Sequence, residues 1–262
     1  MILYESEIEQ CTLELLRDES GYNLAYGPDL LEGLAPERVY NEVVLKGRLK
    51  AAIDKFNPDI PISAREEALK KVLRTESLTL IDNNQAFHRY LTEGVDVKFG
   101  VGEGKSRTDK VWLIDFDHPE NNDFLAVNQY TVVESKSVPP YAPTNKRPDI
   151  VLFINGLPLV VIELKNAADE KADLQAAYRQ LQTYHQQIPS LFKYTAFEVI
   201  SDAWFAKIGT LTSDYSRFME WKSVDGVRVV DSKHEAELEP LVRGLLNKRT
   251  LLDVIRHFIV FE

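Results

Sequence analysis

The segment RPDIVLFINGLPLVVIELKN, residues 147–166, decides the fold, because it contains two apolar runs separated by Asn155 and Gly156. An Asn-Gly pair between such runs is a strong signal for a tight β-hairpin. Three charged side chains interrupt the apolar pattern, namely Asp149, Glu163 and Lys165. Charged residues are seldom buried unless they are paired or bind a ligand. The segment therefore predicts two strands of a central sheet and a chemical site at one end of them.

The three charges are predicted to meet. Successive side chains in a strand point to opposite faces, so Glu163 and Lys165 share one face. Asp149 lies about as far from the turn as residues 163–165 do, so antiparallel pairing brings it to the same end of the sheet. Two neighbouring carboxylates repel each other and are costly to desolvate, and a divalent cation removes that conflict.

These residue types suit phosphodiester hydrolysis. Mg²⁺ prefers oxygen ligands and typically takes one or two carboxylates together with water and substrate phosphate. A neighbouring ammonium can orient or deprotonate the attacking water, or stabilise charge in the transition state. The alternative is that Glu163 and Lys165 form a plain salt bridge on an exposed strand face.

Composition limits the class of protein. The chain has 262 residues, of which 44% are hydrophobic and 27% are charged, which is typical of one large or two small soluble domains. It has neither a signal peptide nor an apolar run of about 20 residues, and a single cysteine, Cys11, so we expect a cytoplasmic protein. The net charge of −10 argues against a protein that coats nucleic acid nonspecifically, but not against an enzyme that binds DNA locally.

The remaining pattern predicts an α/β fold with a mixed central sheet flanked by helices. We expect helices over 6–18, 36–55, 64–77, 83–92, 169–187 and 239–262, and further strands over 110–116, 124–134, 194–201 and 203–210. Ser6 is the expected N-cap of the first helix, with Glu9 as its capping-box partner.

We expect a single domain over residues 1–262. In it, residues 1–95 form a mainly helical N-terminal part, residues 96–215 the catalytic core, and residues 216–262 a helical C-terminal segment. The chain ends on the apolar run FIVFE, so we expect it to be a fragment of something longer.

Two other patterns carry little chemistry. FGVGEGKSRT, residues 99–108, has a Gly-Lys-Ser triplet, but Phe99 stands where a phosphate-binding Walker loop needs glycine. We therefore expect a flexible basic loop there, which could touch DNA phosphates. The five histidines are scattered, and their spacing matches no zinc site.

Pro148-Asp149, thirteen intervening residues and Glu163-Leu164-Lys165 together resemble the PD-(D/E)xK nuclease signature. The segments 147–166, QLQTYHQQIPSLF (180–192) and AKIGTLTSDYSRFMEWK (206–222) resemble the N-terminal nuclease domain of the restriction (motor) subunit of Type I restriction-modification enzymes. The resemblance covers nearly the whole chain and is strongest from about residue 110 onward.

The resemblance implies a restriction-endonuclease-like core and a role for each matching residue. Asp149 and Glu163 match the metal ligands, and Lys165 matches the catalytic lysine. Gln180 and Tyr184, four residues apart on one helical face, match the QxxxY motif of RecB-like nucleases, which supports the active site and the DNA. By themselves they would be ordinary helix-surface residues. Glu9 matches a further metal ligand by helix position alone, and a capping role is equally open.

The family's setting completes the expectation. It implies Mg²⁺, with Mn²⁺ as a substitute, and double-stranded DNA as substrate. It also implies specificity and methyltransferase subunits as partners, and ATP use only through a motor region outside these residues. Two alternatives stay open, a free-standing repair or recombination nuclease with the same core, and a non-catalytic DNA-binding or assembly module.

Overall fold

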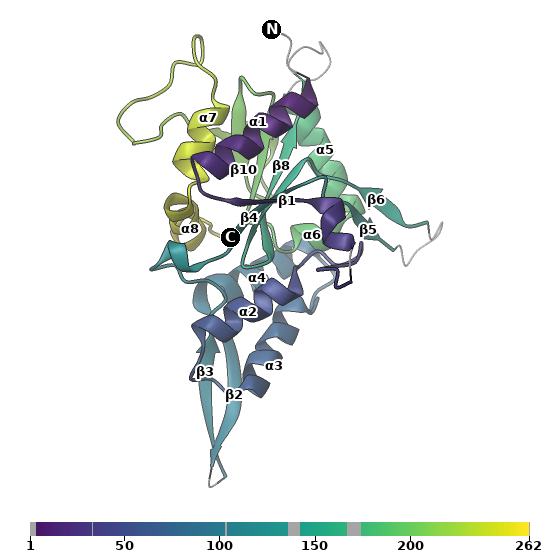
Figure 1. The fold of residues 1–262 in the computed structure, drawn as a ribbon, viewed down its shortest axis with the longest axis vertical. Coiled ribbons are helices and arrows are strands. Elements are labelled where there is room, and N and C mark those ends of the chain that lie inside the picture. The colour runs from purple at the N-terminus through teal and green to yellow at the C-terminus, as the bar shows by residue number, and fades with distance from the viewer. Residues whose placement is uncertain (1–3, 33, 103, 136–141, 167–173, 262) are drawn as a thin grey trace.

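The computed structural model describes residues 4–32, 34–102, 104–135, 142–166 and 174–261. At its centre is a seven-stranded mixed sheet with the order β1-β4-β7-β8-β9-β10-β11 (Figure 1). Two pairs, β1 with β4 and β8 with β9, are parallel, and the other neighbours are antiparallel. The strands are β1 (Asn23–Tyr26), β4 (Phe124–Asn128), β7 (Ile150–Ile154), β8 (Leu157–Leu164), β9 (Phe197–Ser201), β10 (Ala206–Gly209) and β11 (Met219–Glu220). This mixed sheet, flanked by helices, confirms the predicted restriction-endonuclease-like fold.

The β7–β8 hairpin forms the middle of the sheet, as predicted from its Asn-Gly turn. Every residue of both strands is buried. Asn155 and Gly156 adopt φ values of 52° and 79°, the left-handed region that this type of turn requires. The Gly156 carbonyl accepts a hydrogen bond from the backbone N–H of Leu45, at 2.9 Å. The turn is thereby joined to the N-terminal part of the chain.

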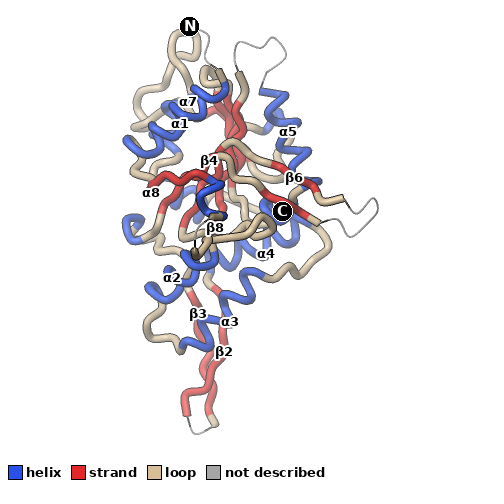
Figure 2. Tube along the Cα trace, turned by 45° about the vertical axis from the view of Figure 1, so that its right-hand side comes forward, coloured by secondary structure: helices blue, strands red, loops and turns tan. Residues whose placement is uncertain are grey.

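Helices pack around this sheet (Figure 2). α1 (Glu5–Asp18) contacts β1, β4 and β8, whereas α5 (Leu174–Gln187) contacts β8 and β9. The remaining elements near the sheet are the short helices α6 (Pro189–Phe192) and α7 (Leu238–Pro240), a π-helical turn (Leu241–Leu245), α8 (Lys248–His257) and the 3-10 turns Gly27–Leu31, Pro119–Asn121 and Tyr215–Arg217. No helix among the described residues is long and apolar enough to cross a bilayer.

A second group of elements lies beyond one end of the sheet. It contains α2 (Lys46–Phe56), α3 (Ile62–Leu73), α4 (Leu80–Glu93) and a long antiparallel hairpin of β2 (Val95–Gly102) and β3 (Lys105–Val111). Figures 1 and 2 both show this hairpin extending away from the rest of the molecule. A third, small sheet pairs β5 (Val132–Glu134) with β6 (Thr144–Lys146).

Three helix predictions are corrected by the structure. Residues 36–45 are not helical, because Arg38 is buried there, with its guanidinium 3.9 Å from the centre of the Tyr130 ring. α1 begins one residue earlier than predicted, with Tyr4 rather than Ser6 at its N-cap. In the C-terminal segment, residues 218–237 contain no helix, and α8 ends at His257. The first residues of the predicted helix 169–187 lie outside the described part of the chain.

Two strand predictions and one loop prediction need correction. The predicted strand 124–134 is two strands, because β4 ends at Asn128 and Val132–Glu134 form β5 of a separate sheet. The predicted strand 110–116 ends at Val111, the last residue of β3. At Trp112 the backbone forms hydrogen bonds with the side-chain amide of Asn57 in place of a neighbouring strand. This amide accepts from the Trp112 backbone N–H at 2.8 Å and donates to the Trp112 carbonyl at 2.9 Å. Within the segment 99–108, residues 99–102 lie in β2 and residues 105–108 lie in β3, where a loop was predicted.

Candidate active site

Asp149, Glu163 and Lys165 come together at the end of the β7–β8 hairpin that lies opposite its turn. Asp149 directly precedes β7, and its Oδ2 accepts a hydrogen bond from the Leu164 backbone N–H at 2.7 Å. Lys165 directly follows β8, and its Nζ donates to Glu163 Oε1 at 2.7 Å and to the Leu164 carbonyl at 2.8 Å. The shared face predicted for Glu163 and Lys165 is thus observed.

The carboxylates of this cluster are strongly perturbed. Glu163 is 2% exposed, and its Oε2 atom is buried without a hydrogen-bond partner. Burial, reinforced by the neighbouring Asp149, raises the pKa of Glu163 to about 8. Burial also raises the pKa of Asp149 to about 6, and the α1 residues Glu5 and Glu9 add to that rise. Burial lowers the pKa of Lys165, but the adjacent Glu163, together with Asp149 and Glu5, outweighs burial, so the net shift is upward.

This donor set fits a divalent cation. An orphaned, buried carboxylate oxygen is costly, and a cation would satisfy it. Among the residues that the structure describes, no group of three or more His, Cys, Asp or Glu side chains is arranged to hold a metal. The donors are therefore a pair, Asp149 and Glu163. A pair matches the one or two carboxylates that Mg²⁺ takes when water and phosphate fill its other positions.

Gln180 and Tyr184 of α5 reach the same place. The Gln180 side-chain amide donates to the Tyr184 hydroxyl at 3.0 Å, and that hydroxyl donates to the Arg147 carbonyl at 3.4 Å. Burial raises the pKa of Tyr184, and the nearby Glu163 contributes to the rise. The two residues thus form a linked pair next to the acids rather than an exposed helix surface.

Glu9 is not a capping residue in this structure. Its carboxylate accepts from the side-chain amides of Asn128 and Gln129, at 2.8 Å and 3.0 Å, at the end of β4. The capping role belongs to Glu7, whose Oε2 accepts from the Tyr4 backbone N–H at 2.8 Å. Glu5, one helical turn before Glu9, also acts electrostatically on Asp149, Glu163 and Lys165. The sequence analysis missed Glu5, although its spacing from Glu9 was a usable signal.

A second buried polar pair lies under α5. Nε2 of His185 is 2.5 Å from Oε1 of Glu198, which is fully buried on β9. Glu198 faces the same side of the sheet as Glu163, because it pairs with Val161 in the parallel register of β8 and β9. The histidines carried no pattern in the sequence, so only the fold reveals this pair, which fixes α5 against the sheet beside Tyr184.

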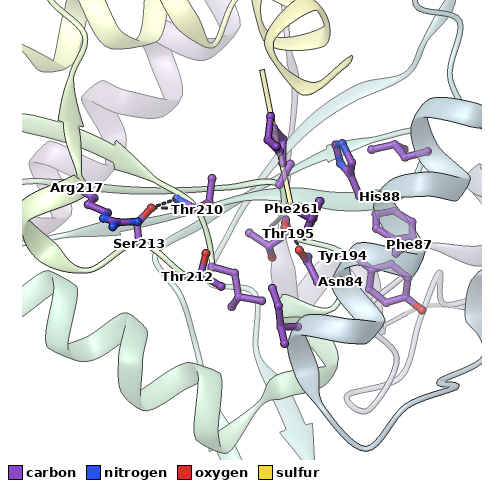
Figure 3. Close-up of a pocket in the computed structure, with 16 residues that line it drawn as sticks. Asn84, Phe87, His88, Tyr194, Thr195, Thr210, Thr212, Ser213, Arg217 and Phe261 are labelled. Atoms are coloured by element: carbon purple, nitrogen blue, oxygen red, sulfur yellow. Dashed lines mark hydrogen bonds between the residues drawn. The ribbon is translucent and has the colours of Figure 1, made fainter. Parts of the chain in front are cut away.

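A separate cavity of about 400 Å³ lies between α4, the loop after β10 and residues 259–261 (Figure 3). None of the six predicted site residues lines it. Its Asn84 amide is already committed to three backbone carbonyls, those of Phe192, Lys193 and Thr195. The acids instead lie at the ends of the central strands β7 and β8.

The fold and the acid–lysine cluster together define a protein of the restriction-endonuclease-like class. Comparison with known proteins is more specific. Residues 2–217 match the family model described as Type I restriction enzyme R protein N terminus. The chain belongs to this family.

Named relatives agree with the family match. The chain is 39% identical to the Type I restriction enzyme HindI endonuclease subunit of Haemophilus influenzae, an alignment that covers 100% of this chain and 24% of that protein. It is 30% identical to the putative type I restriction enzyme MjaIXP endonuclease subunit of Methanocaldococcus jannaschii, over 97% of this chain and 25% of that protein. The chain therefore spans about a quarter of the length of these two relatives.

Proposed function

We propose that this chain is the endonuclease domain of a Type I restriction enzyme R subunit and that it hydrolyses DNA phosphodiester bonds with Mg²⁺. The observation that carries the proposal is the buried Glu163, whose unpaired Oε2 lies beside Asp149 and whose other oxygen accepts from Lys165. Two carboxylates that hold a divalent cation, with a lysine beside them at the ends of two neighbouring strands, suit a phosphodiester substrate. The names of the relatives support the same reading.

Each residue has a distinct role in this proposal. Asp149 and Glu163 hold Mg²⁺, which when bound supplies Lewis acidity toward a phosphate oxygen. Lys165 orients the attacking water or stabilises negative charge on the phosphate, because its ammonium donates two hydrogen bonds at the site already. The Leu164 backbone N–H fixes one oxygen of Asp149. Gln180 and Tyr184 support this arrangement and approach the DNA strand without adding charge.

The setting extends beyond this chain. The relatives are about four times as long, so ATP hydrolysis and translocation along DNA belong to their additional residues in our proposal. Double-stranded DNA is the substrate, and specificity and methyltransferase subunits are the partners. Because the substrate is chromosomal or invading DNA, we place the protein in the cytoplasm.

The test is cleavage of supercoiled plasmid by the full-length subunit with its partners, while ATP hydrolysis is followed in the same reaction. We expect Lys165→Ala to reduce cleavage by about 100-fold or more, because it removes a charge that acts in the transition state, and to leave ATP hydrolysis unchanged. Lys50→Ala is the matched control, since it removes an exposed lysine whose Nζ is 2.7 Å from Asp54.

Other outcomes separate the alternatives. If Lys165→Ala cuts as fast as the wild type, the cluster is structural and the nuclease assignment fails. A non-catalytic assembly module would also show no difference in Mn²⁺ binding between the wild type and Asp149→Asn. A free-standing nuclease would cut at full rate without partners or ATP.

A further inference from the structure

Two aromatic side chains lie exposed on the turn between β9 and β10, residues 202–205, which we call the aromatic turn. Trp204 and Phe205 are each 42% exposed. The turn directly follows Ser201, the last residue of β9, whose carbonyl accepts a hydrogen bond from the Lys165 backbone N–H at 2.9 Å. The Ser201 hydroxyl donates to the Phe205 carbonyl, also at 2.9 Å. Two hydrogen bonds thus connect the backbone of the aromatic turn with that of the lysine in the candidate site.

The aromatic turn lies at the same end of the sheet as the acids. β8 and β9 are parallel, so both end there, and Glu163 pairs with Ile200. Ile200 also pairs with Lys207 of β10, so the side chains of these three residues point to one face. Phe205 is two residues before Lys207 and continues the same alternation. Phe205 therefore lies on the face that carries Glu163 and Lys165.

Hydrogen bonds fix the backbone of the aromatic turn. Oδ1 of Asp202 accepts from the backbone N–H groups of Trp204 and Phe205, at 3.0 Å and 2.7 Å. Ala203 has a φ of 76°, in the left-handed region that residues other than glycine rarely adopt, and such strain concentrates at functional sites. The Trp204 indole N–H donates to the Ser232 carbonyl at 2.9 Å. The turn is therefore ordered before it binds anything, which reduces the entropy lost on binding.

The neighbouring site determines which partner this surface fits. In the proposed function a DNA strand lies across Lys165 and the two acids, on the face where Phe205 lies. The charged groups of the site contact phosphate, whereas the bases of a strand bind aromatic rings by stacking. Stacking does not depend on sequence, because every base has a π-face. Exposed aromatic rings next to this site therefore match a DNA strand.

We propose that Phe205 and Trp204 bind the DNA strand beside the scissile phosphate, by stacking on a base that is separated from its neighbour there. This inference rests on the proposed function. A chain with a net charge of −10 gains little from long-range attraction to DNA, so an apolar contact helps to keep the strand at the site. The aromatic turn thus positions the substrate while the acids and Lys165 act on the phosphate.

The first test locates the contact. Plasmid DNA made with 5-iododeoxyuridine in place of thymidine forms cross-links, on irradiation, to aromatic side chains that stack on it. We irradiate this DNA with the full-length subunit, its partners and ATP, and identify the cross-linked peptides by mass spectrometry. We expect a cross-linked peptide that contains residues 202–205. Cross-links that all lie outside the aromatic turn would overturn the inference.

The second test measures single-turnover cleavage together with ATP hydrolysis. Phe205→Leu keeps an apolar side chain but removes the ring, so we expect cleavage to slow by about 10-fold while ATP hydrolysis is unchanged. Phe205→Trp keeps a ring and should cut at close to the wild-type rate. Trp112→Leu is the control, because Trp112 is 39% exposed and adjoins Leu113, whose carbonyl accepts from the Asn155 side chain at the opposite end of the sheet.

The other outcomes are separable. Wild-type cleavage by Phe205→Leu would overturn the inference. If Phe205→Leu slows ATP hydrolysis as well, the aromatic turn contacts the rest of the subunit instead of DNA, and the inference also fails. A loss that Phe205→Trp does not restore and that follows the unfolding temperature would indicate a packing role. The proposed function fails separately, if Lys165→Ala cuts as the wild type does. If Lys165→Ala stops cutting and Phe205→Leu does not, only the role of the aromatic turn is refuted.

Discussion

At the scale of single residues, Glu163 carries the largest electrostatic cost in the candidate site. Its side chain is buried, and its Oε2 atom has no hydrogen-bond partner. The neighbouring carboxylate of Asp149 raises the pKa of Glu163 beyond the effect of burial. A group with a raised pKa in the native state favours folding at low pH, where it is protonated. That contribution is lost as the pH rises through its native pKa.

Glu163→Gln should therefore flatten the pH dependence of stability in the metal-free protein. Between pH 4.5, its ordinary pKa, and about 8, Glu163 binds more protons in the native state than in the unfolded chain, so its contribution to the free energy of unfolding falls across this range. The substitution should reduce that slope by up to ~1.4 kcal/mol per pH unit. Urea unfolding with a chelator at pH 5, 6.5 and 8 measures it. Glu67→Gln, which removes an acid paired with Lys71 on α3, should leave the slope as it is.

The residue scale also shows what the sequence could not reveal. Asp149, Glu163 and Lys165 were predictable because a hairpin relates them through local pairing. The contact of Gln129 with Glu9 was not, because the two residues lie 120 positions apart in the chain. Likewise, Glu198 acquires a partner only when α5 packs on β9 and brings His185 to it.

At the scale of elements, the β7–β8 turn shows how tightly the central hairpin is enclosed. Gly156 has φ 79°, and a Cβ atom there would lie 2.4 Å from the Leu45 carbonyl oxygen. Gly226 has a similar φ of 75°, but no heavy atom lies within 4 Å of the corresponding position. The two glycines share a left-handed φ but differ in how closely other atoms surround them.

Gly156→Ala should cost more stability than Gly226→Ala. Both place an alanine at positive φ, which costs about 1 kcal/mol. Only Gly156→Ala adds a collision, so we expect a total of about 3 kcal/mol or more for it. Urea unfolding of the two variants measures the difference. Equal losses would mean that the segment before α2 yields to the added methyl group.

Helices and strands were predicted correctly where the deciding contacts are local in sequence, and wrongly where those contacts are remote. The hairpin at 150–164 carries local turn chemistry and apolar runs, and it was predicted correctly. The segment 36–45 has apolar residues at helical spacing, yet Leu45 donates its backbone N–H to the Gly156 carbonyl and Arg38 stacks on Tyr130. Those partners are remote in sequence, and their contacts outweigh the local pattern.

At the scale of the whole molecule, metal binding should be linked to stability. A ligand that binds only the folded state raises the free energy of unfolding by about 2.7 kcal/mol at 100 times its Kd. We expect this from Mg²⁺ in the wild type and not in Asp149→Asn. The gain should be larger at pH 8 than at pH 6, because the cation competes with protons for carboxylates of raised pKa. Thermal unfolding with and without Mg²⁺ measures it, with Asp54→Asn as the control. A gain in Asp149→Asn equal to that of the wild type would place the cation elsewhere.

The pairing of β1 with β4 also has a consequence for the order in which the molecule can fold on the ribosome. Asn23 pairs with Leu125, so β1 must wait until 102 further residues (125 − 23) have been synthesised. At about 5–20 residues per second this delay is roughly 5–20 s. Tyr22 waits longer, since its hydroxyl donates to the Leu246 carbonyl. The segment that carries Glu9 and Gly27 is therefore synthesised well before the strand and the carbonyl group that hold it in place.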